Sequence, residues 1–340
     1  MELVSLLTPC YNMEKYIFRL LDSVLSQTYP TVEMIIIDDG SSDKSADIIK
    51  SYIPKFSERG YSLKYVFQEN SGQSVAIQNG LLLVKGKYLI WPDADDFFAN
   101  NSSIEIFVKK ISSTPSNVAI VRAKQNVLDE KTLKILKIQG IDEDKIEDFS
   151  LFEDCLFSKN GFYWGAGSYM VRMSSLKKAT DLNIYTSKNA GQNWQLFLPL
   201  LYSYKCLSIK DILYNVLERQ ESHSRGFYNG FEKTNLKLET YENTLYETLD
   251  RIKQLPKDKL FEYKNKIKHK YLIEKLDLSY NYHQREAYIK YSHIYRLCYP
   301  QYYTFRKKVS YYLFKYRLQC FLYLRVRILS LLNNGFNREK

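Results

Sequence analysis

The stretch YLIWPDADDFF, residues 88–98, places a short apolar segment directly before a cluster of acidic side chains. Its first four residues are apolar or aromatic and favour a buried strand. Asp93, Asp95 and Asp96 then put three carboxylates within four positions. Two carboxylates held about 4 Å apart repel each other by about 4 kcal/mol at an effective dielectric of about 20. The stretch therefore predicts a strand that ends where a cation or another electropositive group offsets this repulsion.

The residues before this stretch alternate between apolar segments and segments with helical periodicity. We expect strands at 3–8, 32–39, 63–68 and 87–91, and helices at 16–27, 45–53 and 73–84. The strands are followed by the polar motifs TPCYN, DDGSSD, ENSGQ and PDADD, in that order. Continuous apolar strands that alternate with helices predict an α/β fold with a parallel sheet covered on both faces. Because ligands bind at the carboxyl ends of such strands, the four motifs predict one binding site.

Beyond residue 100 the pattern is less regular. We expect a helix at 103–111 and a strand at 118–124, followed by a hairpin or excursion with an acidic end at 127–150. A short strand with a glycine-lined turn is expected at 162–172, a helix that Pro199 kinks or ends at 191–203, and a final globular segment at 206–219. From about residue 232 the pattern is helical and is broken near Pro256 and Pro300. A last helix at about 303–332 is expected to end at Asn333-Asn334-Gly335. The organisation predicts two domains, residues 1–225 and a helical region at 226–340.

Charge is distributed unevenly between these two parts. Residues 1–255 hold 30 Lys and Arg against 32 Asp and Glu, a balance of −2, whereas residues 256–340 hold 19 against 6, a balance of +13. The last segment also contains 14 of the 30 tyrosines. The 5 cysteines are scattered without a CxxC pair, which argues against a zinc site or disulfide framework and for a reducing compartment. We expect neither a signal peptide nor a transmembrane helix, because no sufficiently long apolar run is present.

The order of the motifs resembles the family 2 glycosyltransferases, which are inverting enzymes with the GT-A fold. The resemblance covers about residues 1–225 and rests on TPCYN at 8–12, IIIDDGSSD at 35–43, ENSGQSVAIQNG at 69–80 and DADD at 93–96. It implies a GT-A-type, mostly parallel twisted sheet flanked by helices, with the C-terminal helical region as an extension. Ile77 departs from the family pattern, which usually has Arg at this position.

The resemblance implies a nucleotide-sugar donor, for which we expect UDP as the nucleotide. The expected donor-binding residues are Thr8, Pro9, Tyr11, Asp39, Asn70, Gly72, Asp93, Ala94 and Arg219. Asp39 is implied to accept from the uracil N–H, whereas Asp38 fits a purely structural role in the turn. Asp and Ser also favour turns and helix N-caps, so a structural reading of DDGSSD stays open.

The resemblance also implies a Mn²⁺ or Mg²⁺ ion held by Asp95 and Asp93, with His223 as a further candidate ligand. These cations take oxygen ligands and are typically held by one or two carboxylates together with phosphate. The alternative is a solvated acidic turn, which is less consistent with the aromatic residues on both sides of it. Asp96 is expected to be structural.

The residues at the position of the family's catalytic base differ from the family pattern. Inversion needs a carboxylate that takes the proton from the acceptor hydroxyl, and the family usually has a Glu-Asp pair there. This chain has Gln192 and Asn193, and amides cannot act as general bases. Asp181, Glu221 and His223 are therefore alternative bases. An enzyme that relies on metal and positioning with a weak base, or an inactive chain, would also fit the Gln-Asn pair.

We expect an enzyme that extends a polysaccharide or a lipid-linked oligosaccharide, cytoplasmic and peripheral on the inner face of the plasma membrane. The basic, Tyr-rich region suits an anionic membrane surface, although a packed helical subdomain explains it as well. No nucleic-acid-binding motif accompanies the charge, so nucleic acid is not an expected partner. A catalytically impaired, membrane-associated sugar-nucleotide-binding protein is the alternative. A dinucleotide-dependent dehydrogenase is excluded because GxGxxG is absent after the first strand. The oligomeric state stays open.

Overall fold

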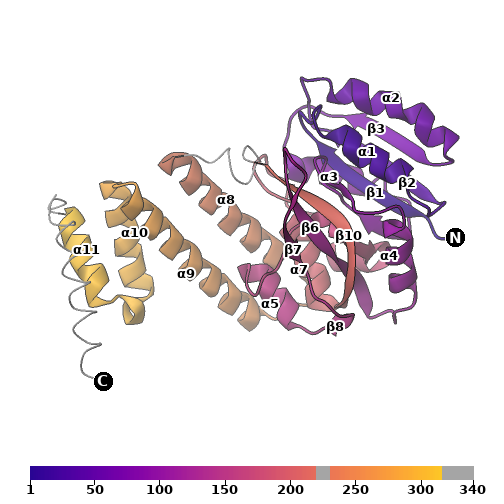
Figure 1. Cartoon of the computed structure of the whole chain (residues 1–340). Coiled ribbons are helices and arrows are strands. Elements are labelled where there is room, and N and C mark those ends of the chain that lie inside the picture. Colours follow the sequence, from indigo (N-terminus) through magenta and orange to yellow (C-terminus); the bar gives the residue numbers. More distant parts are fainter. Residues whose placement is uncertain (220–229, 316–340) are drawn as a thin grey trace. The chain divides into compact units, whose positions relative to one another are not determined.

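The computed structural model describes residues 1–219 and 230–315 and forms two compact units, each of which combines two segments of the chain. The first unit consists of Met1–Arg225 and Asn243–Leu260. The second consists of Gly226–Glu242 and Phe261–Lys340. The mixed α/β first unit and the helical second unit confirm the expected fold class (Figure 1). The segment Asn243–Leu260 returns to the first unit, which the linear division at residue 225 does not anticipate.

The strands of the first unit form one ten-stranded sheet. They are β1 (Val4–Cys10), β2 (Val32–Asp38), β3 (Ser62–Phe67), β4 (Tyr88–Ile90), β5 (Phe97–Phe98), β6 (Val118–Asp129), β7 (Ile135–Gln139), β8 (Lys145–Glu147), β9 (Tyr169–Arg172) and β10 (Lys205–Glu218). The main order is β3-β2-β1-β4-β9-β6-β10-β5, with β7 paired to β6 and β8 to β10. The first four strands in this order are parallel, as the alternating pattern predicted. Beyond β4 the sheet is mixed, because β9 runs antiparallel to both β4 and β6.

Helices cover both faces of the parallel half of the sheet, and successive side chains of β1 point alternately to the two faces. Every residue of β1 is buried, as expected for a strand covered on two sides. Leu6 belongs to the core that also contains buried residues of α1 (Ile17–Leu25), α2 (Ser45–Glu58) and α4 (Ser103–Ser112). Its neighbour Leu7 points to the other face, where Gly80 of α3 (Gln73–Leu81) lies against it. Figure 1 shows α1 and α2 beside strands β1 to β3.

The helix α2 extends past Pro54, whereas the sequence pattern predicted its end at residue 53. A proline inside a helix costs about 3 kcal/mol, because it removes a hydrogen bond and crowds the preceding turn. Phe56 in the last turn is fully buried, and burying a Phe side chain contributes about 1.5–3 kcal/mol. Its ring also contacts that of Tyr61 edge-on, with 6.2 Å between centroids. This burial offsets most of the cost of the proline.

The remaining helices of the first unit are α5 (Ser150–Phe157), the short 3₁₀ helix η1 (Ala166–Ser168), α6 (Met173–Thr180) and α7 (Asn193–Ser203). Pro199 lies inside α7 and does not end it, since the helix continues to Ser203. The residues on both sides of Pro199 are buried, so packing holds this helix as well. The excursion expected at 127–150 consists of the end of β6, the strands β7 and β8 and their connections, as the hairpin pattern predicted.

The second unit is helical throughout its described residues. Its elements are most of α9 (Lys257–Asn281), together with α10 (Arg285–Cys298), the 3₁₀ helix η2 (Pro300–Tyr302) and α11 (Phe305–Lys315), whereas α8 (Phe231–Asp250) is divided between the two units. Leu272 and Leu276 form its core with Tyr288, Tyr291 and Tyr295. The rest of the expected last helix, with its cap at 333–335, lies outside the described residues. Within the described ranges no helix combines the length and apolar character that a membrane crossing requires.

Candidate active site

The loops that follow β1 and β2 are joined by hydrogen bonds. The backbone N–H of Asn12 donates to the Ser41 hydroxyl (2.9 Å), and the Asn12 side-chain oxygen accepts from the N–H of Ser42 (2.8 Å). The N–H of Met13 donates to the hydroxyl of Ser45 (2.7 Å). Asn12 has φ 52°, in the left-handed region that Asn tolerates better than most residues. The TPCYN and DDGSSD motifs therefore form one hydrogen-bonded unit at the carboxyl edge of the sheet.

The Asp39 carboxylate connects this unit to the loop between β3 and α3. Its Oδ1 accepts from the side-chain amide of Gln68 (2.7 Å) and the N–H of Ser71 (2.8 Å), and its Oδ2 accepts from the N–H of Gly72 (2.9 Å). Asp39 is 5% exposed. A carboxylate accepts about four hydrogen bonds, so three internal ones leave capacity for about one more donor.

Asp38 is fully buried, and its partners belong to the protein's own framework. Its Oδ1 accepts from the N–H of Ser41 (2.9 Å), and its Oδ2 accepts from the hydroxyl of Tyr65 (2.7 Å). These bonds fix the turn after β2, in agreement with a structural role for Asp38. Of the two adjacent acids, Asp39 is the one that reaches the neighbouring loop.

Gly72 occupies a position that only glycine fits. It has φ 100°, and a Cβ added to it would lie 2.3 Å from the carbonyl oxygen of Lys188. Close by, the Ser74 hydroxyl donates to the carbonyl of Ser187 (2.9 Å) and accepts from the Ser187 N–H (3.1 Å). The segment that leads into α7 is therefore packed directly against the first turn of α3.

The other expected donor-binding residues differ in exposure. Thr8 and Pro9 near the end of β1, and Ala94 in the acidic turn, are buried. The Thr8 hydroxyl has no hydrogen-bond partner among the described residues. Tyr11 is 46% exposed, and Asn70 is also exposed. Tyr11 and Asn70 are thus the two members of this set that offer accessible side chains.

The acidic turn after β4 contains two partly exposed carboxylates and one buried one. Asp93 and Asp95 are partly exposed, whereas Asp96 is 3% exposed and accepts from the N–H of Leu217 in β10 (2.9 Å). Burial, and then the Asp95 charge, raise the pKa of Asp93 to about 7, with Arg219 acting in the opposite direction. Burial and the charges of Asp95 and Asp93 raise the pKa of Asp96 well above its ordinary value. Asp96 therefore anchors β10, and the three carboxyl groups of the turn are close enough to affect one another's pKa values.

Arg219, directly after β10, is the cation that pairs with this turn among the described residues. Its Nη2 lies 2.6 Å from Asp95 Oδ2, and the two side chains are 12% and 16% exposed. Its guanidinium carbon lies 4.7 Å from the centre of the Tyr16 ring. Burial works to lower the pKa of Arg219, but Asp95 and Tyr16 outweigh it, so the pKa lies above its usual value. The arginine therefore stays charged beside the acidic turn.

Asn193 connects the start of α7 to the end of β4. Its side-chain oxygen accepts from the indole N–H of Trp91 (3.0 Å), and its amide group donates to the carbonyl of Trp164 (3.4 Å). Gln192 beside it is 1% exposed. The Trp164 and Trp194 rings meet edge-to-face at 5.5 Å, and both are partly exposed. The Gln-Asn pair thus lies next to the acidic turn, with Asn193 engaged in bonds between segments.

Of the alternative bases, Asp181 alone lies in the described part of the chain, and its contacts there do not bring it to this point. Asp181 follows α6, and its carboxylate forms an ion pair with Lys253, in which the side chains are 59% and 69% exposed. Glu221 and His223 lie outside the described residues. Ile77, where the family usually has Arg, is fully buried in α3.

The acidic turn fits a divalent cation that shares its ligands with a diphosphate. No group of three or more His, Cys, Asp and Glu among the described residues is arranged to hold a metal by itself. A Mg²⁺ ion on a phosphate substrate typically uses only one or two carboxylates, with phosphate and water completing its octahedron. Asp93 and Asp95 form such a pair, and the Asp95 charge is, after burial, the second cause of the raised pKa of Asp93.

Tyr16, Glu130 and Trp164 lie at this site although no sequence pattern indicated them. The Tyr16 hydroxyl donates to the Glu130 carboxylate although the two residues are 114 positions apart. Trp164 reaches the site through Asn193, which is 29 positions later. No local pattern marks these residues, because each acquires its place only from long-range packing.

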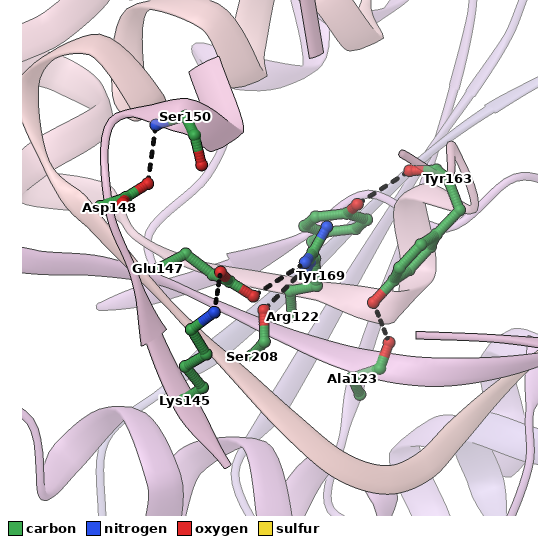
Figure 2. A network of polar contacts seen from close by, with 9 residues as sticks. All are labelled: Arg122, Ala123, Lys145, Glu147, Asp148, Ser150, Tyr163, Tyr169 and Ser208. Atoms are coloured by element: carbon green, nitrogen blue, oxygen red, sulfur yellow. Dashed lines mark hydrogen bonds and ion pairs between the residues drawn. The ribbon is translucent and has the colours of Figure 1, made fainter. Parts of the chain in front are cut away.

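A second buried charge, Arg122 in β6, belongs to a separate network (Figure 2). Its Nε donates to the Ser208 hydroxyl (2.9 Å), and its Nη2 pairs with Glu147 of β8 at 3.2 Å. The guanidinium carbon also lies 5.1 Å from the centre of the Tyr163 ring, and the Tyr163 hydroxyl donates to the carbonyl of Ala123 (Figure 2). Arg122 therefore has its partners within the fold and fastens β8 to the sheet.

The mixed sheet with its parallel half, flanked by helices, has the GT-A-type fold of glycosyltransferases. The sequence profile described as "Glycosyl transferase family 2" matches residues 5–175, just over half of the chain. The chain therefore belongs to glycosyl transferase family 2.

Individual relatives agree with this assignment. Glycosyltransferase GlyA of Streptococcus pneumoniae serotype 4 is 35% identical over 117 residues, which are 34% of this chain and 16% of that protein. The chain spans less than half of the length of the first curated relatives that it matches.

Two solved structures share the fold at low identity. Staphylococcus aureus TarS 1-349 in complex with UDP-GlcNAc has a TM-score of 0.54 and 17% identity over 91% of this chain and 89% of that one. The mannosyltransferase PcManGT of Pyrobaculum calidifontis, in complex with GDP-Man and Mn²⁺, has a TM-score of 0.51 and 13% identity over 97% and 84%.

Proposed function

We propose that this chain transfers a sugar from a UDP-sugar to a saccharide or lipid-linked saccharide acceptor, with inversion and with dependence on Mn²⁺ or Mg²⁺. The observation that supports it most strongly is the acidic turn, where the partly exposed side chains of Asp93 and Asp95 place two carboxylates directly after β4. Such a concentration of negative charge at the carboxyl edge of a parallel sheet favours a cation and a diphosphate at that place.

Different residues on the donor side would bind the base and the diphosphate of the nucleotide. Asp39 has capacity for one further donor, which a uracil N–H would supply, and the accessible Tyr11 offers a flat apolar contact for the base. Asp95 and Asp93 would hold the cation, which when bound supplies stabilisation of the departing diphosphate. Arg219 is charged beside them and would contribute hydrogen bonds to phosphate oxygens. Because PcManGT is in complex with GDP-Man, the experiment below compares GDP-sugars with UDP-sugars as donors.

The acceptor side is proposed to lie at the start of α7. Trp164 and Trp194 are partly exposed beside Asn193, and the Trp194 indole donates to the carbonyl of Cys155 (3.1 Å), which fixes its orientation. Held aromatic faces suit the apolar face of a sugar ring. The side-chain oxygen and the side-chain NH₂ of Asn193 are both engaged, and an amide is not a base. A carboxylate from another segment would therefore take the acceptor's proton. Glu221 is the stronger candidate, because Asp181 is exposed and paired with Lys253.

Association with an anionic membrane surface is proposed for the basic region. Residues 256–340 carry 19 Lys and Arg against 6 Asp and Glu. Each such cation near an anionic surface contributes about 1 kcal/mol of attraction. This association would place the first unit near a lipid-linked acceptor.

A panel of nucleotide sugars tests the reaction. Hydrolysis of UDP- and GDP-sugars is measured with and without Mn²⁺ for the wild type and for Asp95→Ala, and the anomeric configuration of the transferred sugar is read by NMR. We expect turnover of a UDP-sugar that requires Mn²⁺ and is lost in Asp95→Ala. Turnover that is independent of metal and survives Asp95→Ala would overturn the mechanism. Binding of a nucleotide sugar without turnover would favour the impaired binding protein instead.

A further inference from the structure

Four side chains from separate segments form a continuous cluster beside the acidic turn. Asp95 pairs with Arg219, the Arg219 guanidinium lies 4.7 Å from the centre of the Tyr16 ring, and the Tyr16 hydroxyl donates to Glu130. Asp95 belongs to the turn after β4, Tyr16 precedes α1, and Glu130 follows β6. We call these four residues the Arg219 cluster.

Tyr16 holds its place through both ends of its side chain. The ring face lies beside the guanidinium, an attraction between a cation and the electron-rich face of an aromatic ring. The phenol is fixed by the Glu130 carboxylate. Burial and Glu130 raise the pKa of Tyr16 against the effect of Arg219, so the hydroxyl stays a donor at neutral pH. Tyr16 therefore restricts where the Arg219 side chain can lie.

Arg219 and a divalent cation cannot use Asp95 in the same way at the same time. The Arg219 Nη2 is 2.6 Å from Asp95 Oδ2, whereas a Mg²⁺ ion on the same oxygen would approach to about 2.0–2.1 Å. The two positive charges would then be adjacent and repel each other. The Arg219 Nε–H, which is buried, also has no hydrogen-bond partner among the described residues. A diphosphate would offer acceptors both to this group and to a displaced guanidinium.

We propose that Arg219 is a resident counter-cation of Asp95, which a divalent cation replaces when the donor diphosphate arrives, and that Tyr16 and Glu130 are positioning residues that hold it there. This proposal rests on the proposed function. No covalent bond changes in the exchange. Asp95 passes from a guanidinium to the metal, and the guanidinium passes from a carboxylate to phosphate oxygens.

The exchange makes the binding of metal and of nucleotide mutually dependent. Without a nucleotide, the metal has to compete with Arg219 for Asp95, so its affinity is low. With a nucleotide, the displaced Arg219 gains phosphate partners, so each ligand strengthens the binding of the other. Removal of the Arg219 charge should therefore tighten binding of metal alone and weaken its coupling to nucleotide. A purely structural arginine would not produce these opposite changes.

Binding of Mn²⁺, followed by the electron paramagnetic resonance of the free ion, tests the exchange without any turnover. It is measured for the wild-type chain, Arg219→Met, Arg219→Lys, Tyr16→Phe and Asp95→Asn, with and without UDP. Met keeps the apolar stem without the charge, and Lys keeps the charge. Lys87→Met is the matched control, because it removes one positive charge from an exposed pair with Glu2.

We expect Arg219→Met to bind Mn²⁺ alone about 10-fold more tightly than the wild type and to lose most of the gain that UDP gives. Lys87→Met should stay near the wild type, whereas Arg219→Lys, which keeps the charge but not the planar guanidinium, should fall between the wild type and Arg219→Met. Tyr16→Phe retains the ring and removes only the hydroxyl held by Glu130, so it should shift in the same direction by less. It provides the same test if Arg219→Met does not fold.

Two results separate this proposal from the proposed function. If wild-type Mn²⁺ and UDP binding depend on Asp95 but Arg219→Met and Tyr16→Phe bind Mn²⁺ alone no more tightly, the exchange is wrong and the proposed function stands. If the wild type binds neither ligand through Asp95, the metal-dependent function itself is wrong.

Discussion

The indole N–H of Trp91 donates to the side-chain oxygen of Asn193 at 3.0 Å, and this bond joins the end of β4 to the first residue of α7. Trp91 is fully buried and lies two residues before Asp93. The position where the family usually has its base is therefore fixed next to the proposed metal turn. Asn193 maintains this geometry even though it cannot accept a proton from a substrate.

Substitution of Asn193 should separate its structural contribution from its chemistry. Asn193→Ala leaves the buried indole N–H of Trp91 without its acceptor, which should lower the free energy of unfolding by about 1–3 kcal/mol. Asn193→Asp retains an oxygen for the indole and should lose clearly less. Urea unfolding of the two variants and the wild type measures the difference. Equal losses in both variants would show that the Trp91 bond does not stabilise this junction.

Gly72→Ala should disturb the donor side strongly. The substitution requires a φ of 100°, which is strained for alanine, and places a Cβ 2.3 Å from the carbonyl oxygen of Lys188. The atom in the way belongs to the backbone and cannot move aside easily. We therefore expect a lower melting temperature and at least about 10-fold weaker UDP binding, since substitutions at positions with special backbone angles are among the strongly destabilising ones. Gly191→Ala is the matched control, since a Cβ there meets nothing within 4 Å. Similar behaviour of the two variants would contradict the packing described for this loop.

The Asp43 carboxylate should make stability depend on pH in acid. It accepts from the N–H of Glu14 (3.0 Å) and of Ser45 (2.9 Å). Burial works to raise the pKa of Asp43, but hydrogen bonds from Ser45 and Glu14 outweigh it, so the pKa lies below its ordinary value of 3.8. A folded-state pKa below the unfolded one gives stability that is present above 3.8 and is lost as pH falls through the folded value.

The stability difference between the wild type and Asp43→Asn should therefore be constant between about pH 7 and pH 5 and shrink in stronger acid. Urea titrations at several pH values measure it. Asp47→Asn is the control and should show a smaller difference, because Asp47 is an exposed acid in the first turn of α2, which begins two residues after Asp43. A difference that grows as the pH falls would reverse the sign argued for Asp43.

The Trp164 ring should contribute to binding of the acceptor and not to binding or hydrolysis of the donor. It is partly exposed, with the Phe162 ring behind it at 4.7 Å. If it lies under the acceptor sugar, Trp164→Ala should raise KM for the acceptor by about 10-fold, because an aromatic contact contributes about 0.5–1.5 kcal/mol beyond its buried area. Hydrolysis of the donor without acceptor should change little. An effect on donor hydrolysis that equals the effect on transfer would place Trp164 outside the acceptor side.

The sequence was sufficient for the parts of this molecule that local patterns determine. The continuous apolar runs of β1, β2 and β4 and the polar residues directly after them predicted the parallel half and the edge where the motifs gather. The helix past Pro54 was missed because burial of Phe56, which is a tertiary effect, offsets the local cost of proline. The antiparallel insertion of β9 depends on pairing with strands distant in sequence.

The site shows the same division. The places of Asp39, Asp93 and Asp95 at or just after strand ends were predictable from the sequence pattern. The contact between Tyr16 and Glu130 was not, because it spans 114 positions and neither residue lies in a motif. The engagement of Asn193 by Trp91 was equally hidden, since it joins segments 102 positions apart.

Binding of UDP to the wild type and to Asp95→Asn, measured by calorimetry with and without Mn²⁺, tests the central claim most directly. Asn keeps the size of the side chain and removes the charge that would hold the metal. We predict that Mn²⁺ strengthens UDP binding by at least about 10-fold in the wild type and has little effect in Asp95→Asn. An equal gain from Mn²⁺ in both proteins would contradict a metal site at Asp95.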